Sequence, residues 1–125
     1  MNIQAINGIG FMSKAPITRI KQVGNLDGYS TEMLNRCYGE VESFARNYGK
    51  QVMISQKKDS ILVNSGPITS TFNIHKLENP DRDFGQNIIN NIRANTIANE
   101  KGLKKGIEYL EINSPKVGEK LNVVV

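Results

Sequence analysis

Seven apolar or aromatic side chains repeat at steps of three and four residues between positions 34 and 48, and this stripe constrains the fold more than any other feature. Such spacing is typical of an amphipathic helix, whose apolar stripe must face a core. The stripe consists of Leu34, Cys37, Tyr38, Val41, Phe44, Ala45 and Tyr48. We expect a helix from roughly Thr31 to Tyr48, capped by Ser30 or Thr31 and ended by Gly49.

A second amphipathic helix is predicted from roughly Pro80 to Lys101. Asn79 is a favourable cap, and proline is well suited to the first helical position. Gly102 marks the end. The apolar stripe is narrower and more polar than that of the first helix, and it consists of Phe84, Ile88, Ile89, Ile92 and Thr96.

Between the helices the sequence favours strands. Gln51 to Gln56 and Ile61 to Ser65 are short β-prone runs separated by four polar residues, which is typical of a hairpin. Ile68 to His75 continues as a third strand, with Ile68, Ser70, Phe72 and Ile74 on one face. These runs predict an antiparallel meander.

After the second helix we expect one or two further strands. Leu121 to Val125 is strongly β-prone. Ile107 to Ile112 is interpreted as a strand, although Leu103, Ile107 and Leu110 also fit a helical spacing. Which of the two structures this segment adopts stays open at this point.

The first 26 residues contain three of the eleven glycines and no helical periodicity, so they are expected to form an arm. Its run from Ile17 to Val23 either adds an edge strand to the domain's own sheet or crosses to a second copy. We therefore predict an arm over 1–26 and one domain over 27–125. The fold class is α+β, with two amphipathic helices on an antiparallel sheet of about four to five strands, in the order arm-α-β-β-β-α-β-β.

Composition narrows the functional classes. The 125 residues carry a net charge of +4 and one cysteine, which excludes an internal disulfide and the usual zinc ligand sets. No run of eighteen apolar residues occurs, so we expect a cytoplasmic protein without a membrane span. No cofactor or metal is predicted.

Catalysis receives little support from the residue types. Cys37 and His75 are the only candidates for a thiol nucleophile and its base, but Cys37 lies in the apolar stripe and is better interpreted as core. His75 with Asp81 or Asp83 is an alternative acid–base pair, although both aspartates already suit a helix N-terminus. An enzyme with an unrecognised site is therefore the third hypothesis.

The leading hypothesis is a small binding or structural protein that acts through a protein–protein surface, either as a homo-oligomer or with a protein partner. Its candidate residues are the asparagines that recur every four residues, together with two apolar residues of the arm: Asn87, Asn91, Asn95, Asn99, Phe11 and Met12. The alternative is weak nucleic-acid binding without sequence preference, through two lysine doublets. These are Lys57, Lys58, Lys104 and Lys105.

Overall fold

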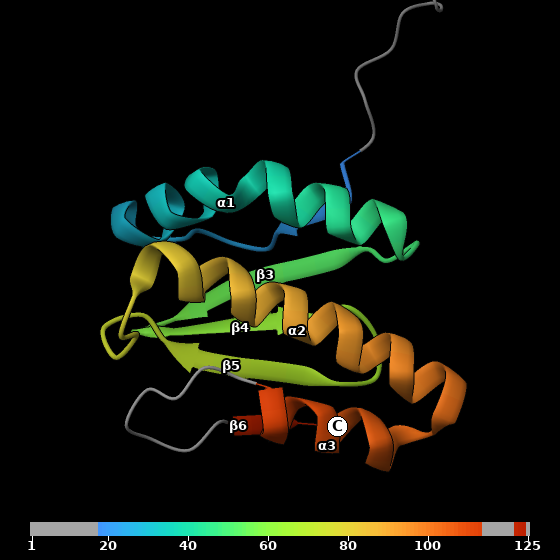
Figure 1. Cartoon of the computed structure of the whole chain (residues 1–125). Coiled ribbons are helices and arrows are strands. Elements are labelled where there is room, and N and C mark those ends of the chain that lie inside the picture. Colours follow the sequence, from blue (N-terminus) through green and yellow to red (C-terminus); the bar gives the residue numbers. More distant parts are fainter. Residues whose placement is uncertain (1–17, 114–121, 125) are drawn as a thin grey trace, which may run out of the picture.

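A computed structural model describes residues 18–113 and 122–124 of the chain. It forms two layers, a sheet and a layer of helices that lies on one of its faces (Figure 1). In chain order the elements are β2 (Ile20–Gln22), α1 (Gly28–Asn47), β3 (Val52–Lys57), β4 (Ser60–Asn64), β5 (Thr69–Asn73), α2 (Pro80–Lys101), α3 (Leu103–Asn113) and β6 (Asn122–Val124).

The sheet is mixed. Its five strands follow the order β2-β3-β4-β5-β6, and every neighbouring pair is antiparallel except β2 and β3, which are parallel. The predicted α+β class is confirmed, whereas the predicted all-antiparallel sheet is wrong. The parallel pair arises because the connection from β2 to β3 contains α1, which returns the chain to the same end of the sheet.

Helix α1 begins earlier than its periodicity suggested. Its cap is Asp27, whose Oδ1 accepts a hydrogen bond from the Ser30 amide at 2.8 Å, so the predicted cap at Ser30 or Thr31 is wrong. The hydrogen bonds from that amide and from Gln56 lower the pKa of Asp27. The C-terminus is as predicted: Gly49 has a φ of +64°, and the next amide, that of Lys50, donates to the Ala45 carbonyl.

Helix α2 has the predicted bounds, with Pro80 in its first turn. The Asn79 side chain makes no capping bond, however. Instead, the backbone amide of Asn79 donates a hydrogen bond to the buried Asp83 carboxylate at 3.1 Å. Asp83 also pairs with Arg82 at 2.8 Å, so its buried charge is compensated.

The segment Ile107 to Ile112 is part of helix α3, and its interpretation as a strand is wrong. Two of its residues, Gly106 and Leu110, are buried where α3 packs beside α2 and the residue that precedes β5. A Cβ atom at Gly106 would lie 2.5 Å from the Ala94 carbonyl oxygen and 2.8 Å from Ile68 Cδ1. The glycine therefore allows α3 to approach α2 closely, and that packing favours the helix.

Residues Ile20–Gln22 of the predicted arm form the edge strand β2 within the chain's own sheet. Glu42 of α1 holds the start of this strand, because its two carboxylate oxygens both accept from the Arg19 amide at 3.0 Å. Burial alone would raise the pKa of Glu42, but the hydrogen bonds from Arg19 and Thr18 and the charge of Arg46 lower it. Residues 1–17 lie outside the described part.

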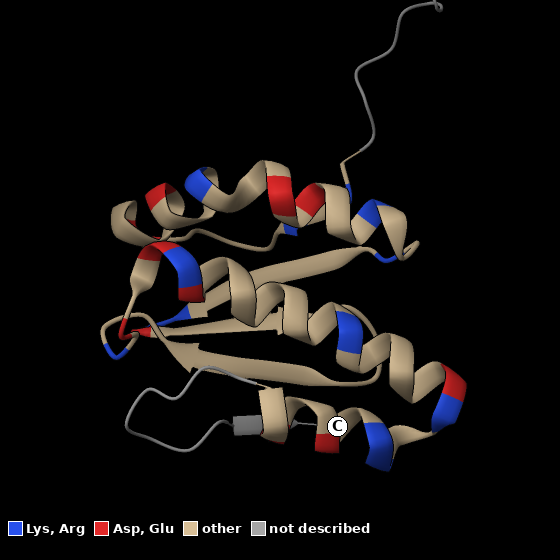
Figure 2. Ribbon diagram, viewed as in Figure 1, with Lys and Arg blue, Asp and Glu red and all other residues tan. Residues whose placement is uncertain are grey.

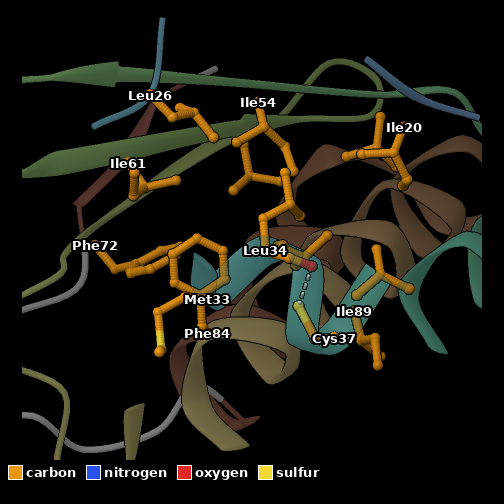
Figure 3. Packing of buried hydrophobic residues seen from close by; sticks show 14 of the residues in the cluster. Ile20, Leu26, Met33, Leu34, Cys37, Ile54, Ile61, Phe72, Phe84 and Ile89 are labelled. Atoms are coloured by element: carbon orange, nitrogen blue, oxygen red, sulfur yellow. Dashed lines mark hydrogen bonds between the residues drawn. The ribbon is translucent and has the colours of Figure 1, made fainter. Parts of the chain in front are cut away.

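The core lies between the sheet and helices α1 and α2. Figure 3 shows side chains from both layers converging in it, among them Ile54 and Phe72 from the sheet and Leu34 and Phe84 from the helices. Phe72 and Phe84 meet edge to face with ring centroids 5.2 Å apart. Cys37 belongs to this core, as its position in the stripe predicted.

Candidate protein-binding site

The asparagine row of α2 does not form an exposed surface. Asn87, Asn91 and Asn95 are buried, and only Asn99 is exposed. Asn87 donates to the carbonyl oxygen of Asp83, one helical turn earlier, at 2.9 Å. The hypothesis that these four amides jointly face a partner is therefore corrected by their burial within the chain.

Asn91 and Asn95 instead hold the turn that joins β4 to β5. The Asn91 amide nitrogen donates to the Val63 carbonyl, the Ile68 carbonyl and the Ser70 hydroxyl at 2.9–3.2 Å. The Asn95 side-chain oxygen accepts from the Ile68 amide at 2.7 Å. Buried polar groups normally have hydrogen-bond partners within the protein. The structural role of Asn91 and Asn95 therefore explains why both amides are buried.

The two lysine doublets lie at opposite ends of the molecule. Lys57 is the last residue of β3 and Lys58 begins the turn to β4, whereas Lys104 and Lys105 lie in the first turn of α3, at the far end of the helical layer (Figures 1 and 2). All four are exposed. Their separation means that they do not form one basic surface along which a nucleic-acid backbone could lie.

The possible catalytic groups are not brought together. Cys37 is buried and donates from its thiol to the Leu34 carbonyl oxygen at 3.5 Å, and burial raises its pKa to about 11 (Figure 3). His75 lies on an exposed loop, 3.5 Å from Asp59 and stacked against Tyr29. Asp81 is paired with Arg36 at 2.7 Å. A raised thiol pKa disfavours the thiolate that nucleophilic catalysis needs.

Phe11 and Met12 lie outside the described residues. Within residues 18–113 and 122–124, no group of three or more metal-binding side chains is positioned to hold an ion. In the same part of the chain, no helix combines the length and apolar character that a membrane crossing requires.

A cluster that the sequence did not predict lies on the outer side of the helical layer. Arg93 projects from the middle of α2, which lies between α1 and α3 (Figure 1). Phe44 and Tyr48 reach Arg93 from the end of α1, and Tyr109 reaches it from α3. We call Phe44, Tyr48, Arg93 and Tyr109 the arginine–aromatic cluster.

The guanidinium of Arg93 is held by aromatic groups on several sides. Its central carbon lies 4.9 Å from the centroid of the Phe44 ring, and Phe44 stacks on Tyr48 at 4.7 Å between centroids. Nη1 donates to the Tyr109 hydroxyl oxygen at 3.3 Å. That hydrogen bond, with a smaller contribution from Tyr48, raises the pKa of Arg93.

The charge of Arg93 is isolated. It is the only charged residue of α2 between Asp83 and Glu100, and Figure 2 shows a single basic band between the two charged ends of that helix. No acidic side chain within the described residues forms an ion pair with it. Arg36 on the neighbouring helix, in contrast, has two carboxylate partners.

The opposite side of the molecule has a different character. The face of the sheet that turns away from the helices carries mainly small polar side chains. These are Ser55, Ser60, Asn64, Thr69, Thr71 and Asn73, with Met53 and Leu62 as the larger apolar members. Asn64 already donates to the Thr69 hydroxyl at 2.8 Å.

Two sequence signals could have indicated the cluster. Arg93 stands alone in a long uncharged stretch of α2, and Phe44 and Tyr48 are one helical turn apart. Tyr109 was placed on a strand, so its approach to α2 was not foreseen. Comparison of the chain with known protein families, with curated proteins and with solved structures finds no match.

Proposed function

We propose that this chain is a small binding module that acts through a protein–protein surface, and that the surface is the arginine–aromatic cluster on the outer side of the helices. The observation that carries the proposal is the gathering of one phenylalanine and two tyrosines around an arginine that forms no ion pair within the described residues. Arginine and tyrosine are the residue types most enriched, with tryptophan, among those that dominate binding energy in interfaces.

The accessibility of the cluster suits this role. Phe44, Arg93 and Tyr109 are half-buried, and Tyr48 is 41% exposed. Their rings and guanidinium are already held by contacts within the chain, so binding would cost little side-chain entropy. The exposed face of the sheet is a weaker candidate, because serine and threonine are under-represented among residues that dominate interfaces.

A partner different from this chain is favoured over a second copy. In a symmetric dimer the same patch meets itself. Joining two copies at this cluster would bring two Arg93 guanidinium groups together without a described carboxylate in the cluster to separate them. Like charges at a partly desolvated interface oppose each other strongly.

The proposal is tested by photo-crosslinking in the cells that produce the protein. A photoreactive amino acid replaces Ile97, which lies one helical turn beyond Arg93, or Leu62 on the exposed sheet face as a matched control. Both positions are half-buried aliphatic residues. We expect one defined crosslinked protein from position 97, its loss when Arg93→Gln is added, and no such product from position 62.

Crosslinking from position 62 without crosslinking from position 97 would show that the wrong face has been chosen. Products at neither position would count against a protein partner altogether. A crosslinked mass of twice the chain, with light scattering showing a dimer in solution, would replace the proposed partner with a second copy.

A further inference from the structure

We infer that the group recognised at the arginine–aromatic cluster is a single carboxylate presented by the partner protein. This inference rests on the proposed function, because it identifies the partner's chemistry at the same surface. It is argued from the hydrogen-bonding capacity of the cluster, from its charge and from its surroundings.

The cluster offers donors. Arginine has five N–H donors and no acceptor, and the described contacts of Arg93 leave several of them unused. The Tyr109 hydroxyl oxygen accepts from Arg93, and the Tyr48 hydroxyl also lies near the guanidinium, so each hydroxyl still holds a proton that it can donate. No acceptor for these two protons is found among the described residues. An ionised carboxylate only accepts, and its planar pair of oxygens fits a guanidinium.

The charge of the cluster matches one negative charge. Arg93 supplies one cation, and no other basic residue of α2 lies between Arg82 and Lys101. A phosphate monoester carries a charge of about −1.5 to −2 at neutral pH, so part of its charge would stay uncompensated against the aromatic rings. A nucleic-acid backbone would require a track of several cations, which this helix does not supply.

The inference is tested by nuclear magnetic resonance of the arginine Nε–Hε groups in the full chain. The Arg93 signal is identified by its absence in Arg93→Gln. The probes are the α-amide of N-acetylglutamate, which carries one carboxylate, the neutral α-amide of N-acetylglutamine, and inorganic phosphate, each added at constant ionic strength. We expect a saturable shift of the Arg93 signal with the carboxylate probe, at an affinity at least about tenfold higher than for the neutral amide.

Matched variants connect that shift to the cluster. Arg36→Gln removes a guanidinium that is already paired with Glu32 and Asp81, and binding should be unchanged. Replacing both Tyr48 and Tyr109 with phenylalanine retains the aromatic rings and removes their hydroxyl donors. Carboxylate affinity should then fall at least about tenfold, because both hydroxyls lose a hydrogen bond to a charged group.

Equal affinity for the acid and the amide, no shift with either, or tighter binding of phosphate would each overturn the carboxylate assignment. These outcomes remain separate from the failure of the proposed function. If position 97 still crosslinks one protein in Arg93→Gln, the protein-binding surface stands and the carboxylate inference falls. If the carboxylate binds at Arg93 but no protein crosslinks from position 97, the anion site stands and the proposed function falls.

Discussion

Asn95→Ala tests how strongly the buried amides hold the sheet against α2. The side-chain oxygen of Asn95 accepts from the Ile68 amide at 2.7 Å. Its nitrogen lies 3.0–3.1 Å from four acceptors, on Ser65, Ile68 and Asn91. An amide nitrogen has two protons and therefore fills two of these positions at once, so the side chain makes about three hydrogen bonds.

Removing those three bonds should cost roughly 3 kcal/mol at about 1 kcal/mol each, and the buried Ile68 amide would lose its acceptor at a further cost of roughly 1–2 kcal/mol. The better helix propensity of alanine returns about 0.6 kcal/mol. We therefore expect the free energy of unfolding to fall by roughly 3.5–4.5 kcal/mol. The measurement is urea denaturation, with the midpoint lowered and the slope unchanged.

The matched control is Asn99→Ala, one helical turn further along the same row. Asn99 is exposed, so the change should lie within about 0.5 kcal/mol and on the stabilising side. A loss of less than about 1 kcal/mol for Asn95→Ala, or equal losses for the two variants, would refute the assignment of the amide network. Either result would also make the asparagine row of α2 a possible binding surface again.

Two further predictions concern packing. Gly106→Ala should destabilise the chain by roughly 1–3 kcal/mol, because its Cβ would lie 2.5 Å from the Ala94 carbonyl oxygen, whereas Gly39→Ala in open space on α1 should stabilise it by roughly 0.5–1 kcal/mol. Equal thermal unfolding midpoints for these two variants would contradict the close approach of α3. Cys37 should react with a thiol reagent slowly in the native protein and quickly in denaturant, since burial raises its pKa to about 11. Identical labelling rates in the native and denatured protein would contradict the burial of Cys37. Because the fold favours the neutral thiol, the contribution of Cys37 to stability is present below about pH 9 and is lost as the pH rises towards 11.

Local signals predicted the elements that depend on local interactions. The bounds of α2 follow from Pro80 and Gly102, which act within one helical turn of themselves. The hairpin of β3 and β4 follows from its two β-prone runs and the polar residues between them, where Lys58 adopts a φ of +57°. In each case the residues that determine the structure are adjacent to it in the sequence.

The incorrect predictions concern elements whose state depends on distant partners. The short segment around Ile107 fits both periodicities, and the choice of helix depends on Gly106 packing against Ala94 and Ile68. The start of β2 is held by a distant contact, because Glu42, more than twenty residues away, accepts from the Arg19 amide. Periodicity within a segment carries no information about such contacts.

The asparagine row and Arg93 show why the proposed surface could not be predicted from α2 alone. A polar row beside an apolar stripe is compatible with exposure, and it is compatible with burial if another segment supplies partners. The turn from Ser65 to Ile68 supplies them here, with backbone groups that no strand satisfies. Once that row is turned inward, the outward side of α2 is left with Arg93 as its only charge between Asp83 and Glu100. The same orientation of the helix therefore makes the buried asparagines structural and leaves the arginine, among side chains from three helices, as the charged group of the proposed surface.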